Sequence, residues 1–349
     1  MSATVMTVMG PIPAEAMGVT LMHEHLLVDA TTWWHPPVEP SRMALADAPV
    51  SCAIYGELRM DPFVNKDNCR LDDVQTAIEE VREFRKLGGR TVVDPTCRGI
   101  GRNPHALRNI AGATGLQIVM GTGFYLEPSH PPDVRRMSVD AIADLIAGDV
   151  LEGLAGVRAG IIGEIGISAG FTPEEQRVLR GAARAQRTAR VPLTIHLPGW
   201  ERHGHRVLDV VAEEGVDPRH VILDHMNPSL DDREYQVSLA DRGAYLEYDM
   251  IGMDYFYADQ TAQSPCDEEN ARALRWLAEN GYLPHLLLSQ DVFLKMMLTR
   301  HGGFGYAYIL RHFVPRLRRH GLTDEQIQTM LVDNPRRIFT AAAGTSEVG

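Results

Sequence analysis

AGIIGEIG at residues 159–166, VPLTIH at 191–196 and HVILDH at 220–225 are the part of the chain that decides its fold. Each is a short run rich in Val, Ile and Leu, and a segment with helical apolar spacing separates it from the next. Continuous apolar runs of this kind are typical of strands that are buried on both faces of a parallel sheet. They therefore predict successive strand–helix units.

The same alternation continues on both sides. Further strands are expected at 19–25, 91–94, 116–121, 244–248 and 285–291, and helices at 71–87, 104–112, 138–151, 172–190, 203–214, 231–242, 267–280, 306–319 and 324–332. Eight strand–helix units predict a (β/α)8 TIM barrel, whose active site lies at the carboxyl ends of the strands. A doubly wound open sheet is the alternative, but only a closed barrel brings the first and last strands together.

We expect the 349 residues to form a single domain, 1–349. The segment 30–70 is rich in Pro and Trp, and it follows the first strand. We expect it to be a loop insert over the barrel mouth, and not a second domain.

The composition limits the partners. The formal net charge is -12, from 34 basic and 46 acidic residues, which argues against nucleic acid or an anionic membrane as the partner. No apolar stretch approaches the ~20 residues that span a bilayer, and the N-terminus lacks a secretory signal. The four cysteines form no CxxC pair, so reduced thiols in a cytoplasmic protein are expected.

A His or carboxylate follows five of the expected strands. Each such residue alone has an ordinary explanation, as a hydrogen-bonded core histidine or a loop cap. All of them at the same end of the barrel favour a metal site instead, because imidazole and carboxylate together suit zinc, manganese, iron or cobalt. The candidate ligands are His23, His25, Glu164, His196, His225 and Asp291.

Six motifs extend this interpretation to a family. They are TLMHEHL, GIIGEIG, PLTIHLPG, VILDHMN, LSQD and NPRRIF. With them, from about residue 5 to 340, the chain resembles the phosphotriesterase-related branch of the amidohydrolase superfamily. The resemblance implies a barrel with a binuclear metal centre. His23, His25 and Asp291 would hold the more buried metal, and His196 and His225 the more exposed one.

Glu164 departs from part of that family. In its organophosphate-hydrolysing members, a carboxylated lysine bridges the two metals at this position. A glutamate offers the same two oxygens without modification of a lysine, so the resemblance implies that Glu164 is the bridge. The change argues against phosphotriester hydrolysis as the main activity.

The expected chemistry is hydrolysis by metal-activated hydroxide of a small-molecule carboxylic ester, lactone or amide. Asp291 would take the proton of the bridging hydroxide and pass it to the leaving group. Two alternatives remain: an organophosphate triester hydrolase, and a non-catalytic metal-containing binding protein. Two divalent ions are expected, with zinc preferred over manganese, iron or cobalt. The family resemblance also suggests a homodimer.

Four residues on loops after the strands are candidates for contacts with the substrate. Trp33 follows the first strand, Arg98 and Arg102 follow the second, and Tyr125 follows the third. The hydroxyl of Tyr125 could bond a substrate oxygen. Either arginine could pair with a substrate carboxylate or phosphate.

Overall fold

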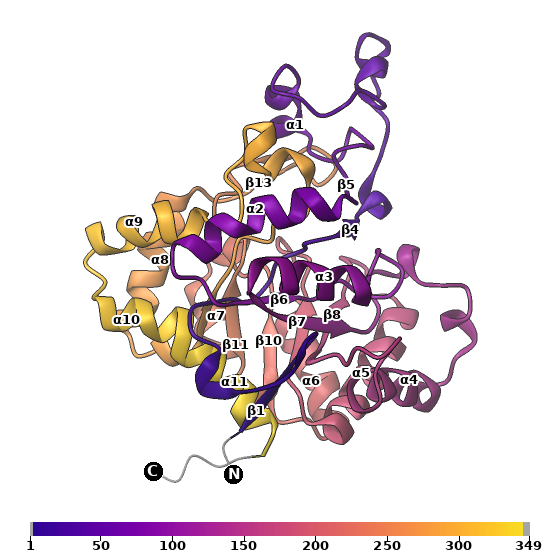
Figure 1. The fold of residues 1–349 in the computed structure, drawn as a ribbon, viewed down its shortest axis with the longest axis vertical. Helices are drawn as coiled ribbons and strands as arrows, with labels where there is room; N and C mark the ends of the chain where they lie inside the picture. The colour runs from indigo at the N-terminus through magenta and orange to yellow at the C-terminus, as the bar shows by residue number, and fades with distance from the viewer. Residues whose placement is uncertain (1–2, 345–349) are drawn as a thin grey trace.

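The computed structural model describes residues 3–344 and contains the predicted (β/α)8 barrel (Figure 1). The ends of the expected single domain, residues 1–2 and 345–349, lie outside the described residues. The eight barrel strands are β3 (Thr20–Leu21), β6 (Thr91–Asp94), β7 (Gln117–Thr122), β8 (Ile161–Gly166), β9 (Leu193–His196), β10 (Val221–Leu223), β11 (Tyr245–Tyr248) and β14 (Leu286–Leu288). They lie side by side in this chain order, and each pair of neighbours from β3 to β14 is parallel.

Each barrel strand from β3 to β11 is followed by a helix of nine or more residues, as the sequence predicts. These helices are α2 (Val74–Lys86), α3 (Pro104–Thr114), α4 (Val139–Leu151), α5 (Pro173–Ala189), α6 (Gly204–Glu213), α7 (Arg233–Asp241) and α8 (Asp267–Glu279). The α5 boundary shows why the prediction works. Thr172 and Glu175 form a reciprocal capping box around Pro173, which satisfies backbone N–H groups at the start of the helix.

The amino end of the barrel is closed by both ends of the chain (Figure 1). The antiparallel strands β1 (Thr4–Thr7) and β2 (Gly10–Pro13) and the helix α11 (Asn334–Ala342) lie there. Val5, Ile338 and Phe339 from these elements pack in one buried cluster with barrel residues such as Val93 and Ile222. This apolar layer leaves the opposite end of the barrel for polar side chains.

Several boundaries differ from the predicted ones. The first strand was expected over 19–25 and the last over 285–291, but β3 and β14 are shorter. The hairpin at 4–13 and helix α11 were not predicted. The helix expected over 306–319 has a π-helical turn at 309–313 before α9 (Val314–Arg319). The helix expected over 324–332 is α10 (Asp324–Gln328) followed by a second π-helical turn.

The insert at 30–70 begins and ends at a short antiparallel pair, β4 (Val28–Asp29) with β5 (Arg70–Leu71). It contains one α-helix, α1 (Tyr55–Met60). In Figure 1 this indigo and purple segment rises above α2, at the opposite end of the molecule from the termini.

Side chains and loop backbone join the two edges of the barrel sheet. The β3 and β14 ends meet through His23 and Ser289, where the His23 N–H donates to Ser289 Oγ over 3.0 Å and Ser289 Oγ donates to the His23 carbonyl over 2.7 Å. Glu24 adds the main contact. Its carboxylate accepts from the backbone N–H groups of Gln290 and Val292, both at 2.9 Å, and from the Gln290 side chain at 3.0 Å. Glu24 is fully buried.

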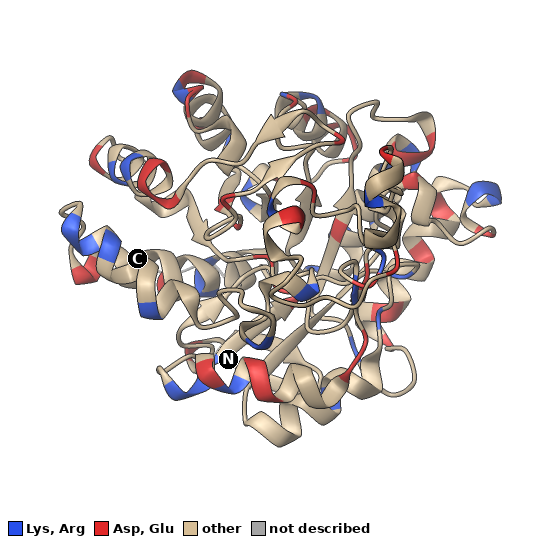
Figure 2. Cartoon of the chain, turned by 90° about the horizontal axis from the view of Figure 1, so that it is seen from above, with Lys and Arg blue, Asp and Glu red and all other residues tan. Residues whose placement is uncertain are grey.

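Charged residues of both signs are interspersed around the outer helices (Figure 2). Among residues 3–344, no helix combines the length and the apolar character that a membrane crossing requires.

We predict that Glu24→Ala lowers the free energy of unfolding by roughly 3–5 kcal/mol, because it leaves several buried N–H donors without an acceptor. Urea denaturation of the metal-loaded protein would measure this loss. Glu152→Ala, at an exposed position after α4, is the matched control and should stay within about 0.5 kcal/mol of wild type. Equal urea midpoints for the Glu24→Ala and Glu152→Ala variants would contradict the role given to Glu24.

Candidate metal centre

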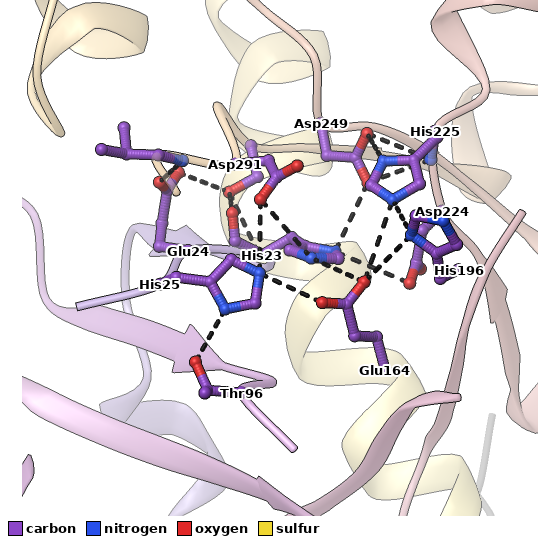
Figure 3. A network of polar contacts seen from close by, with 12 residues as sticks. His23, Glu24, His25, Thr96, Glu164, His196, Asp224, His225, Asp249 and Asp291 are labelled. Atoms are coloured by element: carbon purple, nitrogen blue, oxygen red, sulfur yellow. Dashed lines mark hydrogen bonds and ion pairs between the residues drawn. The ribbon is translucent and has the colours of Figure 1, made fainter. Parts of the chain in front are cut away.

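The structure brings all six candidate ligands together at the carboxyl end of the barrel (Figure 3). They come from, or directly follow, five strands that are distant in sequence: β3, β8, β9, β10 and β14. None of the six is more than 8% exposed. The ligands are His23, His25, Glu164, His196, His225 and Asp291.

Glu164 lies at the middle of this cluster, with its two oxygens facing different histidines. Oε1 is 3.1 Å from His25 Nε2, whereas Oε2 is 3.2 Å from His196 Nδ1 and 3.9 Å from His225 Nε2. His23 Nε2 lies 3.6 Å from Oε2. Ligands of one tetrahedral zinc ion are ~3.3 Å apart, since Zn–N and Zn–O bonds are about 2.0–2.1 Å. These spacings suit a carboxylate that bridges two ions.

The remaining contacts divide the ligands into two groups. Asp291 Oδ1 is 3.4 Å from His25 Nε2 and 3.8 Å from His23 Nε2, so these three side chains could share one ion. His225 Nε2 and His196 Nδ1 are 2.7 Å apart and could share a second. His23, Glu164 and His225 form another close group, and the two-group division is the one that the family resemblance implies.

Polar partners fix which ring nitrogen of two histidines can bind a metal. Thr96 Oγ1 donates to the Leu27 carbonyl, so it accepts from His25 Nδ1 over 2.7 Å and leaves His25 Nε2 with a free lone pair. Asp249 does the same for His225, because its Oδ1 lies 3.0 Å from His225 Nδ1. In each ring the nitrogen left without a proton is the one that faces Glu164.

The unpaired buried atoms of the cluster also fit a metal centre. Among the described residues, both ring nitrogens of His23 and Oδ1 of Asp291 are buried without a hydrogen-bond partner. Buried polar groups are rarely left unpaired unless an ion or another group satisfies them.

The charged groups of the cluster interact strongly: burial alone would lower the pKa of His225, for example, but Asp249 outweighs burial and raises this pKa to about 9. Burial opposes the ionised form of Glu164, but the charge of His23 and contacts with His196 hold its pKa well below the ordinary value. Burial and the neighbouring His225 lower the pKa of His196 to about 4, which keeps it neutral and available as a ligand.

Two of the ligands adopt a backbone conformation that L-residues other than glycine rarely use. His225 has φ of 58° and Asp291 has φ of 48°, both in the left-handed region. Such outliers cluster at functional sites, where the surrounding structure holds them in place. In both residues the turn directly follows a barrel strand.

Sequence reasoning did not identify the residues that support the ligands. Asp224 and Asp249 lie beneath His23, with carboxylate oxygens 3.6 Å and 3.4 Å from its Nδ1. Both follow apolar strands, in VILD and YLEYD, as the ligands themselves do. The same signal would have identified them. Thr96 had no comparable signal, because a threonine in a loop is common.

A cavity of about 400 Å³ opens above the ligands, and two of the four residues that were expected to contact substrate line it. These two are Trp33 and Tyr125. The Trp33 indole N–H donates to the Tyr125 hydroxyl over 3.0 Å, and this hydroxyl is 3.5 Å from His196 Nε2. Burial raises the pKa of Tyr125 well above the ordinary value, so the hydroxyl keeps its proton.

The two arginines lie elsewhere. Neither Arg98 nor Arg102 lines the cavity. Arg98 pairs with Asp133 at 3.1 Å near the surface, and the buried guanidinium of Arg102 pairs with Asp149 at 2.8 Å. Each already has a carboxylate partner within the protein.

Comparisons with known proteins agree with the barrel fold. The model of the phosphotriesterase family matches residues 3–339. An N-acetyltaurine hydrolase of Tetraodon nigroviridis is 35% identical, and the match covers 97% of this chain and 99% of that protein. A resiniferatoxin-binding protein of Rhodobacter sphaeroides has 59% identity and a TM-score of 0.96, over 98% of this chain and 96% of that one. An organophosphorus hydrolase of Deinococcus radiodurans has 29% identity and a TM-score of 0.76, over 97% of each chain.

We predict that Glu164→Gln reduces the bound metal from two ions per chain to one or none, because an amide is a poor bridging ligand. Elemental analysis after dialysis against metal-free buffer measures this loss. Glu234→Gln, an exposed substitution on α7, should keep the wild-type content. Two ions in the Glu164→Gln protein would show that Glu164 does not bridge.

Proposed function

The chain belongs to the phosphotriesterase family and is a metal-dependent hydrolase, and we propose that it cleaves the ester, lactone or amide bond of a small molecule at a binuclear centre. The observation that carries this proposal is the convergence of the six candidate ligands, with Oε1 of Glu164 facing His25 and Oε2 facing His196. The unpaired buried atoms of His23 and Asp291 support it further. A metal-containing binding protein would share this ligand set, and the hydrolase relatives favour catalysis over binding alone.

We propose that His23, His25 and Asp291 hold one ion, that His196 and His225 hold the other, and that Glu164 contacts both. When bound, two divalent ions lower the pKa of water and polarise a carbonyl oxygen. Zinc fits the nitrogen-rich ligand set, and manganese, iron or cobalt would fit as well.

The protein's own side chains would then move the proton and orient the substrate. Asp291 has one oxygen, Oδ1, directed at His23 and His25, so its second oxygen is the proposed site for the proton of the attacking water. From there the proton reaches the leaving group. The Tyr125 hydroxyl accepts from Trp33, which leaves its own proton available for the substrate's carbonyl oxygen.

The relatives bear on which bond is cleaved. N-acetyltaurine hydrolases act on an amide, and their 31–35% identity over nearly the whole chain supports carbonyl chemistry here. Hydrolysis of organophosphate triesters is a second candidate, supported by the likeness to the Deinococcus radiodurans enzyme. Glutamate in place of the modified lysine makes it the weaker one. A single-domain homodimer in the cytoplasm completes the proposal and rests on composition and family resemblance.

We predict that Asp291→Asn lowers kcat roughly 100- to 10,000-fold, because an amide cannot accept the proton. Steady-state kinetics on a substrate from a panel of lactones, esters and amides would test this. Since Asp291 is also a candidate ligand, metal content is measured in the same preparation. Unchanged kcat with full metal content would exclude the proposed proton transfer.

A further inference from the structure

Five aromatic side chains line one side of the cavity above the metal ligands. Phe63 lies at the centre, with its ring centroid 5.4 Å from Trp33, 5.7 Å from Tyr257 and 6.1 Å from Phe293. Trp200 continues the row, 5.3 Å from Tyr257. All five belong to the lining of the cavity. We call them the aromatic wall.

The wall is assembled from four separate parts of the chain. Trp33 and Phe63 come from the insert, Trp200 from the loop after β9, Tyr257 from β12 (Phe256–Tyr257) and Phe293 from the loop after β14. The Trp33 and Phe63 rings are stacked, with 15° between their planes. Because the rings support one another, the wall presents a fixed apolar surface next to the reacting centre.

The rest of the cavity is also apolar. Met250 and Met253 line it, and methionine adapts to apolar groups of different shape. Among the described residues that line the cavity, none is a lysine or an arginine. Within the part of the lining that the structure describes, the carboxylates are Glu164 and Asp291, the candidate metal ligands.

This composition discriminates between substrates. A carboxylate or sulfonate located away from the reacting bond would lose its water and find no lysine or arginine beside it in the described lining, which is costly. An uncharged ring in the same place would gain by leaving water and by packing against the wall.

We propose that the aromatic wall is the binding subsite for an uncharged aromatic group of the substrate that lies outside the cleaved bond itself. Phe63 sets this preference because it contacts three of the other four rings. The inference rests on the proposed hydrolase function. It separates this chain from the N-acetyltaurine hydrolases that it resembles, since N-acetyltaurine is an anion.

Three lactones with the same cleaved bond test the proposal: γ-butyrolactone, γ-phenyl-γ-butyrolactone and γ-(4-carboxyphenyl)-γ-butyrolactone. With metal-loaded protein, kcat/KM for the phenyl lactone should exceed that for γ-butyrolactone by roughly 50-fold or more. It should exceed the value for the carboxyphenyl lactone by about 10-fold or more. N-acetyltaurine should be the poorest of the four substrates.

Variants connect the preference to the wall. Phe63→Ala should reduce the ratio of kcat/KM for the phenyl lactone to that for γ-butyrolactone about 10-fold, and Phe63→Leu should reduce it less. Tyr282→Ala, which removes an aromatic ring outside the cavity, should leave the ratio at the wild-type value. Gln260→Arg adds a cation at an exposed position of the lining and should raise the carboxyphenyl-to-phenyl ratio about 5-fold or more.

A binding measurement separates failure of this inference from failure of the proposed hydrolysis. 2-Phenyltetrahydrofuran and its 4-carboxyphenyl counterpart lack the reactive carbonyl. The binding of each compound can be followed by the fluorescence of Trp33 and Trp200. Tighter binding of the neutral compound without turnover of any lactone would support the subsite and overturn the hydrolase. Equal or tighter binding of the anion, or turnover of N-acetyltaurine at or above that of the phenyl lactone, would overturn the subsite.

Discussion

The closure of the barrel between its first and last strands is the constraint on which the metal centre depends. His23 and Asp291 come from opposite edges of the sheet, and the Asp291 N–H donates to the His23 carbonyl over 3.2 Å. The backbone contact alone is a single hydrogen bond. Glu24 strengthens the closure, since its buried carboxylate holds the N–H groups on both sides of Asp291. The residue between the two histidines therefore positions the carboxylate that they share.

Three further carboxyl groups lie buried close to the centre. Asp224, Glu247 and Asp249 are fully buried near His23, and among the described residues neither carboxylate oxygen of Glu247 has a hydrogen-bond partner. Burial and the neighbouring Asp224 raise the pKa of Glu247 well above the ordinary value, so this group carries its proton. The pKa of Asp249 is lowered instead, because its interactions with His225 outweigh its burial. Bound divalent ions would balance the negative charge of the carboxylates that stay ionised.

The sequence was sufficient to predict the barrel and the six candidate ligands, because both depend on local patterns. A Val- and Ile-rich strand followed by His or a carboxylate is visible in IIGEIG or TIH without any knowledge of distant contacts. The hairpin at 4–13 was missed because GPIP has no strand-like alternation, and it is stabilised by packing on the barrel floor. Arg102 was expected to reach the substrate, but its partner Asp149 is 47 residues away on α4. Pairings of that range cannot be predicted from residue type and spacing.

The same reasoning explains why reaction type and substrate are predicted with such different success. The ligands are part of the strand ends, whose geometry the barrel fixes, so their chemistry follows from the motifs. Phe63 contacts the neighbouring rings because the insert folds back over the cavity. Nothing in the local sequence DPFVN indicates that Phe63 makes these contacts. A change in such a loop alters which molecule fits without disturbing Glu164 or Asp291. Members of one family can therefore act on a charged amide in one protein and, as we infer here, on an uncharged aromatic substrate in another.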